Sequence, residues 1–153
     1  MTESKDKNAP DRRRARPSGA RRESARRAAR AADAGADESR DLALVVATAA
    51  LEKKALAIEI LDVVGKVDYA DFLVLMTGRS NRHVDSLAQA IDEACAKKKK
   101  RALSVEGLPL ASWVLIDFGD VVVHIFQEQA RGLYDIEGLW LDAKRLPVPG
   151  ENP

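Results

Sequence analysis

The sequence predicts an α/β domain in which helices flank a mixed β-sheet. Three observations predict this fold class. Two apolar runs of strand length stand on either side of Gly119-Asp120, apolar residues recur at helical spacing after Asp41 and after Ser80, and shorter β-rich runs lie between these segments. With 46% hydrophobic residues, the 153-residue chain is long enough for one packed core and a tail.

The first 40 residues nearly lack large apolar side chains, which predicts a disordered, basic Ala/Arg-rich tail. Residues 1–40 hold 12 Lys/Arg against 7 Asp/Glu, whereas residues 41–153 hold 13 against 17. A basic tail therefore precedes an acidic α/β domain at residues 41–146. Two interpretations of the tail stay open: an arm that contacts RNA phosphates, or a solubilising extension.

The domain begins with a helix and two strands. Apolar spacing predicts a helix over residues 41–54, with Ser39 or Asp41 as its N-cap. Residues 57–64 are short and β-rich and predict a strand, although a continuing helix is the alternative. Residues 71–76 are apolar throughout and predict a strand that is buried on both faces.

A second helix follows, capped by Ser80 or Asn81, with Cys95 on its apolar stripe. It ends in five consecutive cations at residues 97–101. These cations are either a nucleic-acid contact or favourable charges at the negative end of the helix dipole. Residues 102–105 are expected to form a brief strand.

Residues 113–126 predict a β-hairpin, because Gly119-Asp120 supplies the positive φ of a tight turn. Pairing Phe118 with Val121 sorts the side chains into two faces. One face is wholly apolar and suits the core: Val114, Ile116, Phe118, Val121, Val123 and Ile125. The other mixes large apolar and polar groups: Trp113, Leu115, Asp117, Val122, His124 and Phe126.

The chain closes with a helix over residues 128–137 that Gly138 stops. Residues 139–141 are expected to pack back on the domain, and residues 147–153 to form a flexible C-terminus.

The residues give little support for catalysis. His83 and His124 are the only histidines, neither is spaced to pair with a nucleophilic serine, and Cys95 fits the core. Scattered ligands of this kind predict no metal site and no cofactor. We expect no catalytic residues.

The location can also be inferred from the sequence. A single cysteine excludes an internal disulfide and fits a reducing compartment. No run approaches the length of a membrane span and the N-terminus lacks the apolar core of a signal peptide, so we expect a cytoplasmic protein without a membrane partner.

One alternative function is a nucleotide-dependent enzyme. It depends on residues 77–80 (Thr-Gly-Arg-Ser), which lie between a predicted strand and a helix N-terminus. Backbone N–H groups at such a place can hold an anion. Nucleotidyltransferases carry Gly-Ser at that place, but they also need paired carboxylates on an adjoining strand. Here Asp117 and Asp120 are separated by a turn, so the catalytic pair is absent.

Five blocks in order resemble the ribosomal silencing factor family, RsfS or Iojap, and the resemblance covers about residues 42–143. The blocks are Asp62-Val63, residues 71–84, Val105-Glu106-Gly107, residues 113–126, and Arg131-x-Leu133-Tyr134-x-x-Glu137-x-Leu139-Trp140.

The resemblance implies a nucleotidyltransferase-like fold without catalysis. It also implies binding to ribosomal protein fourteen of the large ribosomal subunit, which prevents the small subunit from joining and represses translation when nutrients are scarce. The tail lies outside the shared region, so whether it contacts ribosomal RNA stays open. Whether the protein is a monomer or a homodimer stays open.

The expected partner-binding residues are Trp113, Leu115, Asp117, His124, Glu106 and Tyr134. Trp113 is the expected anchor, since Trp is the commonest interface hot spot, with a core Trp as the alternative. Asp117 and Glu106 would meet cations of a basic ribosomal protein. His124 would order Asp117 or Trp113 or serve as a core histidine, and Tyr134 would extend the surface or pack inside.

Overall fold

The computed structural model describes residues 19–108 and 112–150, and of residues 19–34 and Tyr134 it describes the backbone alone. The chain divides into two compact units, Met1–Ala34 and Gly35–Pro153. The described part of the first unit, residues 19–34, is helical. The packing described below is that of the second unit.

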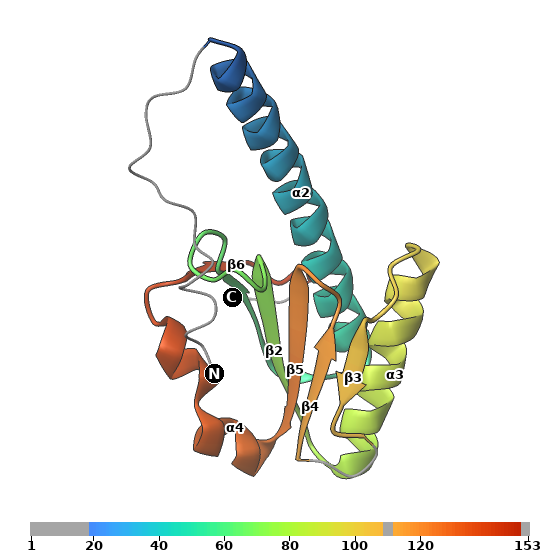
Figure 1. The fold of residues 1–153 in the computed structure, drawn as a ribbon. Coiled ribbons are helices and arrows are strands. Elements are labelled where there is room, and N and C mark those ends of the chain that lie inside the picture. The colour runs from blue at the N-terminus through green and yellow to red at the C-terminus, as the bar shows by residue number, and fades with distance from the viewer. Residues whose placement is uncertain (1–18, 109–111, 151–153) are drawn as a thin grey trace. The chain divides into compact units, whose positions relative to one another are not determined.

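A six-stranded mixed sheet forms the centre of the second unit, with the strand order β3-β4-β5-β2-β1-β6 (Figure 1). Its strands are β1 (Leu56–Asp62), β2 (Phe72–Gly78), β3 (Ser104–Glu106), β4 (Trp113–Asp117), β5 (Val121–Gln127) and β6 (Lys144–Leu146). β2 and β5 pair in parallel, and all other neighbours are antiparallel. The predicted fold class is confirmed, and β2 is buried along its whole length as predicted.

Helices cover both faces of the sheet (Figure 1). Residues 35–52 of α2 (Gly19–Glu52) and α3 (Asn81–Lys97) bury one face in the larger core, which includes Val46, Leu87 and Phe72. On the other face, α4 (Glu128–Tyr134) and the 3-10 helix η1 (Ile136–Trp140) pack over a smaller cluster around Leu75 and Phe126. Within the part of the chain that the structure describes, no helix is both long enough and apolar enough to cross a membrane.

The hairpin forms as predicted. Phe118 N–H donates to the Val121 carbonyl (2.9 Å), and Gly119 has φ +97°, a value that favours glycine at the first central position of a tight hairpin turn. Asp117 pairs with Val122 and Trp113 with Phe126, so the predicted division into two faces holds. The six residues of the apolar face all belong to or pack against the larger core.

Two local predictions in the first half of the domain are also confirmed. Ser80 caps α3, since its side chain accepts a hydrogen bond from His83 N–H (3.1 Å). The stretch after α2 is a strand and not a continuing helix, because the chain turns through Lys54, whose φ is +65°.

The first helix differs from the prediction. It begins at Gly19, so residues 19–40, predicted as disordered tail, are helical, while residues 1–18 lie outside the described residues. The physical reason is local: Ala and Arg have high helix propensity even where no apolar stripe exists. Ser39 is also no N-cap. It is buried inside the helix, with Oγ 2.9 Å from the Gly35 carbonyl oxygen and 3.0 Å from Oδ2 of Asp71.

The C-terminal part differs as well. The predicted helix over residues 128–137 is interrupted at Asp135, whose φ of +47° ends α4 before η1 begins. β6 was not predicted, and it pairs antiparallel with β1. Within the end that was expected to be flexible, Val148 is buried in the larger core, whereas residues 147, 149 and 150 are exposed; residues 151–153 lie outside the described residues.

Candidate protein-binding face

Five of the six predicted binding residues share one face of the sheet, on strands β3, β4 and β5. Register decides this: Glu106 pairs with Leu115, Leu115 pairs with His124, and Trp113 and Asp117 lie two residues to either side of Leu115. We call Glu106, Trp113, Leu115, Asp117 and His124 the hairpin face. It lies on the opposite side of the sheet from α3, because the intervening residues of β4 and β5 fill the larger core.

Trp113 is half-buried and is held in place by its neighbours. Its indole Nε1–H donates to Nδ1 of His124 at 3.0 Å, and its ring lies 5.3 Å from that of Phe126. The structure combines the two expectations for Trp113. Part of the indole ring packs against the smaller cluster, and the rest is accessible to solvent. Such a fixed, amphipathic aromatic side chain loses little entropy on binding a partner.

His124 orders Trp113 and not Asp117. Burial lowers the pKa of His124 to about 4, so the imidazole is neutral at pH 7. Accepting a hydrogen bond from Trp113 requires an unprotonated Nδ1, which places the proton of the neutral ring on Nε2. His124 is therefore a buried support for the hairpin face.

The two carboxylates of the hairpin face differ in their freedom. Asp117 is half-buried, and its Oδ1 accepts a hydrogen bond from Gly119 N–H at 2.8 Å, so this side chain also closes the hairpin turn. Glu106 is exposed on the edge strand, and no described residue forms an ion pair with it. Glu106 is thus the carboxylate that can meet a partner's cation at the least cost in desolvation.

The rest of this side of the sheet is covered by the C-terminal segment, held by Arg131. This buried guanidinium contacts Glu137 (2.9 Å), Glu59 (3.0 Å) and the Thr77 hydroxyl (3.1 Å), and it donates to the Ala57 carbonyl. Burial alone would raise the pKa of Glu137, but hydrogen bonds and positive charge from Arg131 outweigh it and lower that pKa. The sequence block with Arg131 and Glu137 indicated this segment, but not its anchoring role.

Tyr134, the sixth predicted residue, ends α4, and its side chain is outside what the structure describes. The same segment exposes Leu133, Leu139 and Leu141, which are 79%, 70% and 78% exposed. The expectation that residues 139–141 pack back on the domain is therefore wrong for Leu139 and Leu141 and holds for Trp140, which packs against the smaller cluster. Exposed apolar side chains of this size are candidates for protein contact. Leu133 lies three residues before Ile136, the helical spacing that predicted a packed side chain, so the sequence did not indicate its exposure.

The strand-to-helix junction at residues 77–80 is built for packing. A Cβ on Gly78 would lie 2.8 Å from Cγ2 of Val84, so glycine allows α3 to approach β2 closely. The backbone N–H groups of Arg79 and His83 already donate to Nδ1 of His83 and to Ser80. These interactions explain the Gly-Arg-Ser sequence without a bound phosphate.

The other side chains that could react or bind a metal are either buried in the core or far apart. Burial raises the pKa of the Cys95 thiol to about 12, with a further contribution from Asp92, which makes it a core residue and a poor nucleophile. Among the side chains that the structure describes, no three from His, Cys, Asp or Glu gather as metal ligands. The hairpin face offers instead an apolar anchor beside carboxylates, which suits a protein partner.

A family model described as "Ribosomal silencing factor during starvation" matches residues 36–153. The chain belongs to the ribosomal silencing factor (RsfS) family. This confirms the resemblance identified from the five sequence blocks, and RsfS proteins are regulators of translation by name. The family match begins before the predicted boundary at residue 41, in agreement with the packed residues at the end of α2.

Named relatives and a solved structure agree with this membership. The chain is 33% identical to ribosomal silencing factor RsfS of Halalkalibacterium halodurans over 112 residues, covering 73% of this chain and 96% of that protein. It is 36% identical to RsfS of Bacillus subtilis over 99 residues, 65% of this chain and 84% of the other. A crystal structure of a Chromobacterium violaceum protein is similar with a TM-score of 0.66 and 28% identity, covering 74% and 93%.

Proposed function

We propose that this RsfS protein binds ribosomal protein fourteen of the large ribosomal subunit through the hairpin face. Bound there, it sterically blocks association of the small subunit and represses translation under nutrient limitation in the cytoplasm. The observation that carries the proposal is Trp113, a half-buried indole fixed by His124 beside Leu115 and Asp117. An aromatic anchor on a face that also carries Glu106 and Asp117 has the composition of an interface hot spot.

Charge supports the choice of a basic partner. Residues 41–153 carry 17 Asp/Glu against 13 Lys/Arg, and Glu106 and Asp117 lie on the hairpin face itself. A ribosomal protein that folds against RNA is basic, so its cations would be steered toward these carboxylates. Complementary charge of this kind raises the rate of association and excludes acidic partners.

Steric exclusion requires only affinity and bulk. The protein needs no reacting group at the hairpin face, and we propose that it is not an enzyme. Asp117 is engaged in the hairpin turn, and Asp120 lies beyond it at a position that is exposed. The nucleotide-dependent alternative therefore has no observation in its favour at this site.

Truncation of Trp113 tests the proposal. Trp113→Ala should weaken co-sedimentation with purified large subunits by roughly thirtyfold, the effect of losing a hot spot worth about 2 kcal/mol. Val105→Ala is the matched control, because Val105 lies on β3 beside Glu106 but pairs with Ile116 on the opposite face. It should bind like the parent.

The melting temperature separates an interface from a core residue. Because Trp113 also packs against the smaller cluster and donates to His124, some fall in melting temperature is expected, and weaker binding by the folded protein supports the hairpin face as the contact. A large fall in melting temperature with unchanged binding of the remaining folded protein would show that Trp113 acts only in packing, which costs about 3–5 kcal/mol for a core Trp.

A further inference from the structure

The five cations Lys97–Arg101 are a feature that the proposed protein contact does not use. They join α3 to β3, and all five side chains are exposed. The domain as a whole is acidic, so this segment is a local reversal of its charge. A reversal of this size calls for a physical explanation.

The helix dipole accounts for only part of the segment. α3 ends at Lys97, and Lys98 is its C-cap, so Lys99, Lys100 and Arg101 lie beyond the helix. The favourable effect of a cation at a helix C-terminus falls off within the last turn. Three of the five charges therefore gain little from the helix.

Ion pairing within the domain also leaves most of the charge unbalanced. Lys100 lies 3.6 Å from a carboxylate oxygen of Glu38, and both side chains are largely exposed. No other ion pair among the described residues involves this segment. Lys97, Lys98, Lys99 and Arg101 thus present four charges to solvent.

The backbone of the segment is nevertheless fixed. Lys99 N–H donates to the Ala96 carbonyl (2.8 Å) and Lys100 N–H to the Cys95 carbonyl (2.9 Å), the pair of bonds that closes a Schellman turn. Lys99 occupies the left-handed position of this turn with φ +60°, where glycine is usual. The chain therefore places a cation at a position that glycine would fill with less strain.

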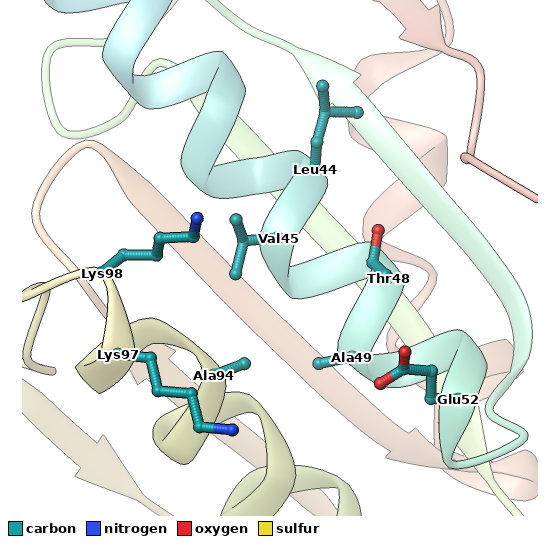
Figure 2. Close-up of a pocket in the computed structure, with 8 residues that line it drawn as sticks. All are labelled: Leu44, Val45, Thr48, Ala49, Glu52, Ala94, Lys97 and Lys98. Carbon is teal, nitrogen blue, oxygen red and sulfur yellow. The ribbon is translucent and has the colours of Figure 1, made fainter.

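Two of these cations border a hollow in the surface. Lys97 and Lys98 extend along a groove of about 360 Å³ between α2 and α3, whose apolar lining includes Val45, Ala49 and Ala94 (Figure 2). Low-dielectric walls beside cations strengthen the local field that attracts an anion. Glu52 also lines this groove and offsets part of the charge, so the electropositive surface is the exposed segment from Lys97 to Arg101, whose backbone the Schellman turn fixes.

This surface adjoins the strands of the hairpin face. Two residues after Arg101, Leu103 N–H donates to the Asp117 carbonyl at 2.7 Å, and β3 with Glu106 follows directly. The cations end α3, on the side of the sheet opposite the hairpin face, and only the three-residue edge strand β3 separates the two surfaces. A body large enough to extend past this edge can contact both. A ribosomal subunit is such a body, and most of its mass is RNA.

We propose that Lys97, Lys98, Lys99 and Arg101 bind backbone phosphates of large-subunit ribosomal RNA beside the protein partner. The inference rests on the proposed function, since it assigns a second contact to the same complex. Each phosphate neutralised by a cation releases condensed counterions, so the contact makes binding to the subunit salt-dependent. The acidic hairpin face and the basic segment would then recognise the two chemical components of the ribosome separately.

Neutralising the four cations tests this directly. In full-length protein carrying Lys97→Gln, Lys98→Gln, Lys99→Gln and Arg101→Gln, affinity for purified large subunits should fall about tenfold or more at moderate salt. The slope of log affinity against log salt concentration should become shallower by about three, because each lost phosphate contact removes roughly 0.7–0.9 from it.

A matched variant controls for net charge. Lys53→Gln, Lys54→Gln, Arg82→Gln and Lys144→Gln removes the same charge from four other exposed cations. It should retain the parental slope and bind subunits within about twofold of the parent. Equal losses in the two variants, or a parental slope in the first, would overturn the inference.

Isolated components separate this inference from the proposed function. Purified ribosomal protein fourteen should bind the parent and the first variant equally, and a loss of that binding would make the segment a protein contact and reject RNA. If the parent binds neither that protein nor large subunits, the proposed function fails. The slope measured with deproteinised large-subunit RNA then decides the inference alone: a shallower slope for the first variant supports it, and equal slopes reject it.

Lys99→Gly adds a readout that a structural role would not give. Glycine relieves the strain of φ +60°, so the melting temperature should rise while the salt slope loses about one contact. A higher melting temperature with a parental slope would remove Lys99 from the site.

Discussion

The hydrogen bond from Trp113 to His124 couples the orientation of a binding side chain to the protonation of a buried one. Nδ1 can accept this bond only while it carries no proton. Because burial lowers the pKa of His124 to about 4, the bond persists throughout the physiological pH range. The anchor of the hairpin face is thereby insulated from ordinary changes in pH.

The lowered pKa of His124 predicts a pH dependence of stability. The unfolded chain binds a proton near pH 6.5 and the folded protein only near pH 4, so stability rises with pH between these values and falls on acidification. From pH 7 to pH 5, the free energy of unfolding should decrease by about 2 kcal/mol through His124 alone.

Urea unfolding at pH 7 and pH 5 measures this loss, with His124→Phe as the comparison. The variant lacks the titrating group and should lose about 2 kcal/mol less over the same interval. An identical loss in both proteins would mean that His124 is not kept neutral by burial.

Arg131 belongs to the scale of elements, because one side chain joins α4 and η1 to two strands. It contacts Glu59 on β1, Thr77 on β2 and Glu137 on η1, residues that are up to 72 positions away in the chain. Arg145 on β6 then contacts the other oxygen of Glu59 at 2.7 Å. The network fixes the segment that carries the exposed leucines.

Arg131→Met should destabilise the domain strongly, by about 3–5 kcal/mol, because it leaves the partly buried carboxylates of Glu59 and Glu137 without their shared cation. Chemical denaturation measures the change. Lys66→Met is the matched control: it removes an exposed pair with Asp142 and should leave the melting temperature almost unchanged. Comparable effects of the two substitutions would contradict the importance assigned to burial.

The N-terminal boundary gives a second prediction at this scale. We propose that the folded domain starts at Gly35, so a protein comprising residues 35–153 should melt at the parental temperature. Removing residues 35–40 as well deletes Ser39, which is buried against Asp71, and Glu38, which pairs with Lys100. That loss should cost about 1 kcal/mol or more. Equal melting of both truncated proteins would place the boundary at residue 41.

The elements with alternating or helical apolar patterns were predictable from the sequence. The hairpin followed from Gly119 and parity, and α3 from its Ser80 cap and apolar stripe. β6 has no such pattern, since its three residues are specified by pairing with β1 and by the contact of Arg145 with Glu59. The first part of α2 depends on the helix propensity of Ala and Arg. The low content of large apolar residues there predicted disorder instead.

The candidate site shows the same division. Parity placed Trp113, Leu115 and His124 on one face, as the register confirms. Whether His124 holds Trp113 or Asp117 depends on side-chain geometry, which no spacing encodes. Arg131 could not be assigned its contacts, because they span segments that only the tertiary fold brings together.

On the scale of the whole molecule, steric exclusion predicts a dependence on the order of addition. Protein incubated with large subunits before small subunits are added should suppress their joining. The same amount added after joining should have a much smaller effect, because the small subunit then covers the proposed site. Sedimentation of free and joined subunits measures both, with Trp113→Ala as the inactive comparison. Equal effects in either order would contradict exclusion.

The two edges of the sheet, β3 and β6, are each three residues long. Such short edges, bearing Glu106 on one and Lys144 and Arg145 on the other, offer little unpaired backbone to a strand of another molecule. The four longer strands, which would be prone to aggregate if their edges were exposed, lie between these two short strands. We therefore expect little edge-to-edge pairing between copies of the domain.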